Sequence, residues 1–225
     1  MGGGFQIVEL ILLAMIAGFV ALRLRNVLGK KTGHEHTRQP NGQAGNVHNL
    51  HGKISSEDHA KNKFLIALEA FGTLPTTVKE NLKSLNELEP GFDLNGFLEG
   101  SKSAYPMILE NFWAGDMGLI KSFLNKTICK QFQTVIDDRE AEGLVVENKV
   151  LEIRDTDIKD VQINGKTVEI TVEFKTDIIS VTRDKDGKLV EGDLTDAVDV
   201  VDVWTFARKV GNQDPNWTLV QTRAG

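Results

Sequence analysis

The feature that most constrains the fold is a change in hydrophobic period at Gly143. From Phe92 up to this glycine, apolar residues recur every three or four positions, as on one face of an amphipathic helix. After it, apolar and polar residues alternate, which is typical of an antiparallel strand with one buried face. The alternation is clearest at Val168, Ile170, Val172 and Phe174. Helices followed by a meander of four strands predict an α+β fold, with the helices on one face of an antiparallel sheet.

Local signals place the ends of these helices. Asp93 is expected to cap a helix that Pro106 kinks or splits, because proline lacks the N–H that a helix interior needs. Gly115 should end that helix, and the aspartate after it should start the next one. A further helix is predicted from about Lys126 to Glu142, with Gly143 as its C-terminal glycine.

Turn residues divide the second half into strands. Asn164-Gly165 predicts a tight hairpin in which both residues occupy the turn, because both tolerate positive φ. Asp186-Gly187 predicts a second turn. Long alternating segments then predict strands over Val198–Arg208 and Trp217–Thr222.

The N-terminal 30 residues predict a transmembrane helix. Phe5 to Leu24 is mostly apolar and about twenty residues long, enough to cross ~30 Å of hydrocarbon. Basic residues that could meet lipid headgroups follow at once: Arg23, Arg25, Lys30 and Lys31. The positive-inside bias then places the rest of the chain on the cytoplasmic side of an inner membrane, or in the matrix if the protein is mitochondrial.

Composition divides the chain after this anchor. Residues 31–56 are polar and predict a flexible linker, residues 57–91 predict two short amphipathic helices, and residues 92–225 predict the main domain. Thr77 and Glu80 resemble a capping box for the second short helix. The apolar stripes of the two helices are Phe64, Leu68 and Phe71, then Leu82, Leu85 and Leu88. Such stripes either pack on the chain's own core, which is the commoner case, or dock on a partner or a membrane surface.

The side chains of the main domain argue against an enzyme, a cofactor or a metal. All five histidines precede residue 60, which removes the commonest general base and metal ligand from the domain. Cys129 lies among apolar residues and is interpreted as a core thiol. No glycine-rich phosphate loop or Ser-His-Asp set is present. From Phe92 onward the chain has 16 basic and 24 acidic residues, so the domain is net negative. Nucleic acid is therefore an unsuitable partner, and a protein is the better one.

One strand carries the candidate pocket residues Asp202, Trp204 and Phe206 on the same face. Trp217 can meet the two aromatic residues across the last hairpin. If the face is concave, Asp202 lies in an apolar pocket and its pKa is raised, as in acid-base sites. The alternative, which we favour from the sequence, is a salt bridge to Arg208 or a position at the exposed end of the strand.

Several segments resemble the Tim44-like domain family in order and spacing, over about residues 92–225. They are Phe97–Tyr105, Phe112–Asp116, Arg139–Gly143, Asp202–Phe206 and Asp214–Trp217. The Asp-x-Trp-Thr-Phe strand followed by Asp-Pro-Asn-Trp is the specific part. Pro106 departs from the polar helix former usual in the family.

The resemblance implies a cone-like fold of the nuclear transport factor two type, with a curved sheet around a hydrophobic concavity. With its anchor and linker, the chain resembles alphaproteobacterial import-translocase adaptors. The mitochondrial namesake is a peripheral adaptor that recruits a DnaK-type chaperone to the import channel and contacts cardiolipin. We therefore expect a non-enzymatic adaptor at the inner membrane that binds a membrane-protein or translocation partner. The alternative is a tethered small-molecule or lipid-binding domain with weak acid-base catalysis through Asp202.

Overall fold

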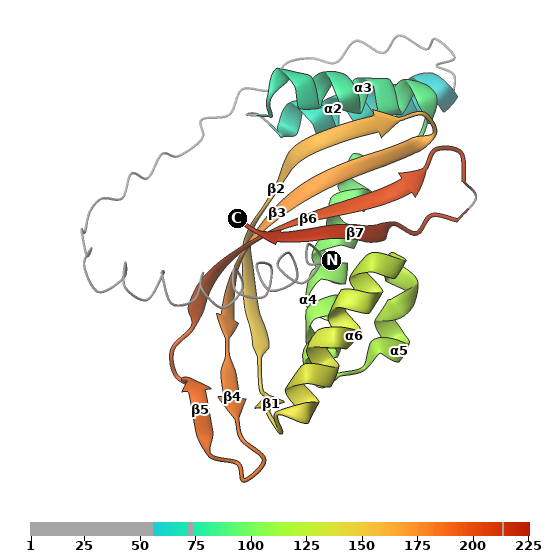
Figure 1. Cartoon of the computed structure of the whole chain (residues 1–225). Helices are drawn as coiled ribbons and strands as arrows, with labels where there is room; N and C mark the ends of the chain where they lie inside the picture. Colours follow the sequence, from blue (N-terminus) through green and yellow to red (C-terminus); the bar gives the residue numbers. More distant parts are fainter. Residues whose placement is uncertain (1–55, 72–73, 213) are drawn as a thin grey trace, which may run out of the picture.

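The change of period at Gly143 separates the helices from the strands in the computed structural model, which describes residues 56–71, 74–212 and 214–225 (Figure 1). The helices are α2 (Ser56–Ala70), α3 (Thr76–Leu88), α4 (Leu94–Ala114), α5 (Met117–Ile120), the 3₁₀ helix η1 (Lys121–Phe123) and α6 (Lys126–Ala141). The strands are β1 (Val145–Val146), β2 (Lys149–Asn164), β3 (Thr167–Ile179), β4 (Val181–Arg183), β5 (Leu189–Gly192), β6 (Val198–Lys209) and β7 (Thr218–Ala224). This is the α+β arrangement predicted from the sequence.

The predicted ends of α4 are confirmed. The Asp93 side chain accepts a hydrogen bond from the Gly96 amide at 3.0 Å, which satisfies one of the free N–H groups of the first turn. Gly115 ends the helix at φ 77°, a left-handed conformation that suits glycine. Asp116 then caps α5 through the Gly118 amide.

Two helix predictions are corrected. α4 runs through Pro106 as one helix of 21 residues, so the proline does not split it, and the alternative of a kink stays a prediction. The capping box at Thr77 and Glu80 is wrong, because α3 begins at Thr76 after Pro75 and has no side-chain cap. Proline before the first helical residue already sets the φ angle of the entering chain.

The main sheet is an antiparallel meander in the order β2-β3-β6-β7, as the alternating pattern predicts. One face of β3 is buried at every second residue along its length. The first hairpin also forms, but its loop is Gly165 and Lys166, since Asn164 pairs with Thr167. Only Gly165 of the predicted pair therefore occupies the turn, with φ 62°.

A second small sheet, β1-β4-β5, was not predicted. It lies beyond a break at Ser180, where β3 ends and β4 begins, and Figure 1 shows it on the far side of the point where the long strands converge. Gly192 makes this break possible: it has φ 91°, and a β-carbon there would overlap the Ser180 carbonyl oxygen.

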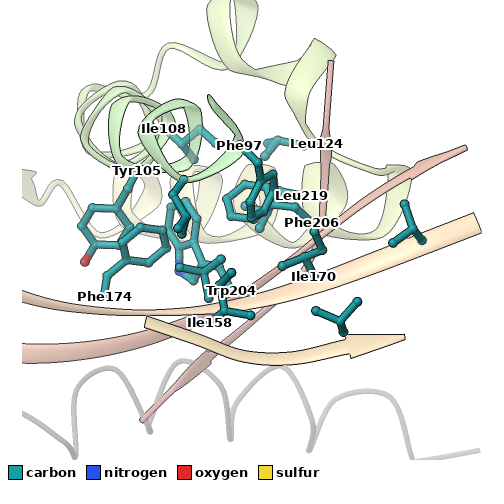
Figure 2. Close-up of a cluster of buried hydrophobic side chains, with 14 of the residues drawn as sticks. Phe97, Tyr105, Ile108, Leu124, Ile158, Ile170, Phe174, Trp204, Phe206 and Leu219 are labelled. Atoms are coloured by element: carbon teal, nitrogen blue, oxygen red, sulfur yellow. The ribbon is translucent and has the colours of Figure 1, made fainter. Parts of the chain in front are cut away.

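The helices cover one face and both edges of the main sheet. α4 packs across the sheet, α3 lies against β2, and α6 lies against β7. Asn125, just before α6, closes part of the β7 edge: its amide donates to the Leu219 carbonyl at 3.0 Å, and its side chain donates to the Val220 carbonyl at 3.2 Å. The core lies between α4 and the sheet, where aromatic rings gather (Figure 2).

None of the helices in the described residues is long and apolar enough to cross a membrane. The predicted anchor over Phe5 to Leu24 and its basic flank, Arg23, Arg25, Lys30 and Lys31, lie outside the described residues, as does most of the predicted linker.

Candidate functional site: the inner face of β6

The candidate site follows from strand geometry. Successive side chains of a strand point to opposite faces, so every second residue of β6 faces α4. These inner-face residues are Asp202, Trp204, Phe206 and Arg208. The face therefore has an acid at one end, a base at the other, and two aromatic rings between them.

The acid end is closed. Asp202 accepts a hydrogen bond from the Tyr105 hydroxyl of α4 at 2.5 Å, and that hydroxyl lies 3.2 Å from the Thr176 hydroxyl of β3. Phe174 stacks on Tyr105 with ring centroids 4.5 Å apart, and Trp204 lies 4.7 Å from Tyr105. Figure 2 shows these three rings side by side at one end of the core. Tyr105 and Thr176 have no exposed surface.

This geometry corrects the interpretation of Asp202 that we favoured from the sequence. Asp202 is neither at an exposed strand end nor paired with Arg208, which lies at the other end of the face and pairs with Glu89. Burial raises the pKa of the Asp202 carboxyl, and the hydrogen bond from Tyr105 lowers it by a smaller amount. Burial and the neighbouring Asp202 also raise the pKa of Tyr105, which therefore stays protonated and can donate.

The basic end is open and its charges are paired. Arg208 Nη2 contacts Glu89 at 2.5 Å, and the guanidinium lies 5.0 Å from the centre of the Trp217 ring. The Arg208 side chain is only 9% exposed, and Glu89 is 24% exposed. Glu89 lies directly after α3 and also accepts from the Gly211 amide at 3.4 Å. A cation stacked on an indole and hydrogen-bonded to a carboxylate is held firmly in place.

A half-open cleft of about 390 Å³ lies at this basic end. Its walls come from the α3–α4 connection, one face of α4, η1, the end of β6 and the β6–β7 loop. The lining residues include Glu89, Phe92, Asp93, Phe97, Phe206, Arg208, Asn216 and Trp217. The Phe97 and Trp217 rings lie 4.6 Å apart and make much of the wall apolar. Neither Asp202 nor Tyr105 lines the cleft.

Small residues in the α4 wall of the cleft leave space in the cleft. Gly96, Gly100 and Ala104 follow one another at four-residue spacing, so they share one face of the helix. A β-carbon at Gly100 would meet no atom within 4 Å. Packing within the described part of the chain therefore does not require glycine at this position.

The sequence profile of the Tim44-like domain matches residues 78–224. The chain belongs to the Tim44-like domain family. This Tim44-like domain is 24% identical over 152 residues to a human protein named mitochondrial import inner membrane translocase subunit TIM44, covering 66% of this chain and 34% of the relative. It is 23% identical over 148 residues to a Caenorhabditis elegans protein named probable mitochondrial import inner membrane translocase subunit tin-44, covering 64% of this chain and 35% of the relative.

The Tim44-like chain thus spans about a third of the length of these curated relatives. Among solved structures, the intermembrane space region of the chloroplast protein ARC6 is similar with a TM-score of 0.40 and 11% identity, covering 59% of this chain and 96% of that one.

The structure separates the predicted site residues of the Tim44-like domain into three groups. Trp204 and Phe206 lie in the core with Asp202, and Phe206 also reaches the cleft. Leu82 and Leu85 of α3 have no exposed surface, which is the geometry of the core alternative, whereas Leu88 is 54% exposed. An interaction role for Leu88 stays a prediction. No group of three or more potential metal ligands occurs among the described residues.

Sequence reasoning missed Glu89 and Gly100, and it assigned Arg208 the wrong partner. The Glu89–Arg208 pair joins residues 119 positions apart, so nothing local predicts it. Gly100 did leave a signal, since glycine is unfavourable inside a helix.

Proposed function

We propose that this domain is a non-enzymatic adaptor that takes part in protein translocation at an inner membrane by binding a protein partner. The observation that carries the proposal is the half-open cleft at the basic end of β6, because concave, largely apolar sites with a few polar groups are where proteins usually bind other molecules. Membership of the Tim44-like family, with relatives named as import translocase subunits, supports the link to translocation.

The placement of the titratable groups supports a binding role over catalysis. Asp202 has a raised pKa, but its carboxyl is buried. It accepts a hydrogen bond from Tyr105, which packs on Trp204, and it does not line the cleft. A general acid must reach the proton it transfers. The cleft itself holds an ion pair whose charges already satisfy each other.

Membrane attachment is a further part of the proposal. The apolar segment from Phe5 to Leu24 would anchor the chain as a single span, and Arg23, Arg25, Lys30 and Lys31 would meet lipid headgroups on the side that holds the domain. Alkaline carbonate should then leave the full chain in the membrane pellet.

Site-specific photocrosslinking in intact membranes tests the adaptor role. A benzophenone amino acid at Asn216, exposed beside the cleft, should give a crosslink to an integral inner-membrane protein. The matched control is Lys188, which is equally exposed but lies in the turn between β4 and β5. Equal crosslinking from both positions, or none from Asn216, would contradict the proposal.

A second candidate function is binding of a small molecule or lipid in the same cleft. Its volume of about 390 Å³ supports this candidate, because ligand pockets span roughly 300–1,000 Å³. Native mass spectrometry of the full-length protein would then detect a bound small molecule, and filling the cleft should release it.

A further inference from the structure

We propose that the cleft receives an uncharged hydrophobic peptide segment of the partner, whose apolar side chains pack on the Gly96–Ala104 face of α4 and whose main-chain carbonyl accepts a hydrogen bond from Arg208 Nε. The inference rests on the proposed function, since it names the chemistry of the segment that the domain binds. Three observations carry it: an unexplained glycine, an unpaired buried donor, and balanced charges.

The glycine is Gly100. Alanine is favoured over glycine inside a helix, and a β-carbon at Gly100 would enter open space. Gly96 and Ala104, one turn before and after it, line the same cleft. At Gly100 the backbone of α4 is open to close approach, whereas at Gly96 the Asp93 side chain already lies 3.2 Å from where a β-carbon would be. The surface at Gly100 is therefore the one on which the side chains of another segment can pack.

The donor is Arg208 Nε. It is buried and makes no hydrogen bond within the described residues, although Nη2 of the same guanidinium is taken by Glu89. Buried donors are normally paired, because leaving one unpaired costs free energy. Arg208 lines the cleft, but Nε itself has almost no accessible surface, so an acceptor oxygen reaches this donor only when the entering segment displaces the groups that cover it.

The charges of the cleft select the kind of acceptor. Glu89 already neutralises Arg208, and Lys63 pairs with Asp93 at the rim at 3.0 Å. A phosphate, a carboxylate or an ammonium group entering here would bring an uncompensated charge against apolar walls, which is costly. A peptide carbonyl brings an acceptor oxygen without a charge. The segment that enters is therefore uncharged where it meets Arg208.

Peptide binding to the full-length protein in lipid nanodiscs tests the inference. The probe is a fluorescein-labelled peptide, Gly-Leu-Phe-Leu-Gly, blocked at both ends, followed by fluorescence anisotropy. Peptides with Lys or Glu in place of Phe are the charged comparisons. We expect the apolar peptide to bind at least tenfold more tightly than either charged peptide.

Two variants of α4 locate the binding. Gly100→Leu fills the cleft and should weaken the apolar peptide at least tenfold without lowering the melting temperature. Ser103→Leu adds the same side chain to the exposed face of the same helix and should bind like the unmodified protein.

Arg208→Lys keeps a positive charge opposite Glu89 but lacks Nε, and should weaken binding several-fold.

Three results would overturn the inference: no binding of the apolar peptide, equal binding of a charged peptide, or normal binding by Gly100→Leu. Failure of the inference is distinguishable from failure of the proposed function. If Asn216 still crosslinks to its membrane partner in the Gly100→Leu protein, the adaptor role stands and the partner lies at the mouth of the cleft without inserting a segment against α4.

Discussion

At one end of β6 a buried carboxylate, Asp202, is held by a tyrosine hydroxyl, and at the other end Glu89 is held by the guanidinium of Arg208. The closed end is sealed by Tyr105 and Trp204, and burial shifts the acid toward its neutral form. At the open end, Glu89 and Arg208 form an ion pair that lines a cleft. The two ends of the inner face of β6 therefore differ in role: the closed end stabilises the fold, and the open end remains available for binding.

The largest expected difference between the ends concerns their tryptophans. Trp204→Ala should cost about 3–5 kcal/mol, because its side chain is only 1% exposed and the cavity cannot collapse easily. In a domain of this size, each kcal/mol of lost stability lowers the melting temperature by roughly 2–4 °C. Trp217→Ala should cost clearly less, since Trp217 is only partly buried beside the cleft. Thermal unfolding followed by circular dichroism measures both, and equal losses would contradict the distinction.

The ion pair gives the next largest effect. Arg208→Met leaves Glu89 without its counter-charge and should cost about 1–3 kcal/mol, less than a fully buried pair because Glu89 is 24% exposed. Adding Glu89→Gln to Arg208→Met should recover part of this loss. A double-mutant cycle from urea unfolding gives the coupling energy. Additive effects of the two substitutions would mean that the pair is not coupled.

Asp202→Asn should change the pH dependence of stability. The folded-state pKa of Asp202 is raised above 3.8, so the folded protein binds this proton more tightly than the unfolded chain does. Its stabilising contribution is present below pH 3.8 and is lost as pH rises through the folded pKa. Asn cannot ionise, so the variant should melt above the unmodified protein at pH 7–8. That advantage should shrink toward pH 3. A variant that is less stable at every pH would show that Asp202 acts mainly through its hydrogen bond to Tyr105.

The smallest effect is expected at the open end of α4. Gly100→Ala should raise stability by up to about 1 kcal/mol, because alanine favours the helix and its β-carbon meets no atom within 4 Å. A small rise in the urea midpoint with an unchanged m-value is the expected readout. A loss of stability would mean that the free space beside Gly100 is smaller than the structure indicates.

The sequence predicted the parts of this molecule that depend on local pattern. The buried face of β3 and the caps at Asp93 and Gly115 follow from residue spacing and turn chemistry. The small sheet β1-β4-β5 was not predicted, because β4 and β5 are only three and four residues long. Strands this short do not show a clear alternation of apolar and polar residues. The partners of Arg208 and Asp202 could not be predicted, because they come from residues far away in the sequence. Arg208 pairs with Glu89, directly after α3, instead of with Asp202 of its own strand, and Tyr105 is a partner of Asp202 from 97 positions away.

The position of Asn125 beside β7 has a consequence for how copies of the chain behave when crowded. An open strand edge invites another strand to pair with it, which is the usual route to aggregation through sheets. Asn125 occupies the Leu219 and Val220 carbonyls, so a second copy cannot pair there without displacing it. On the opposite edge, β2 has three breaks in its pairing register and carries Asp155 and Asp157. Such irregular, charged edges discourage fibril-like stacking. The domain can therefore be concentrated with little tendency for its main sheet to grow from one molecule into the next.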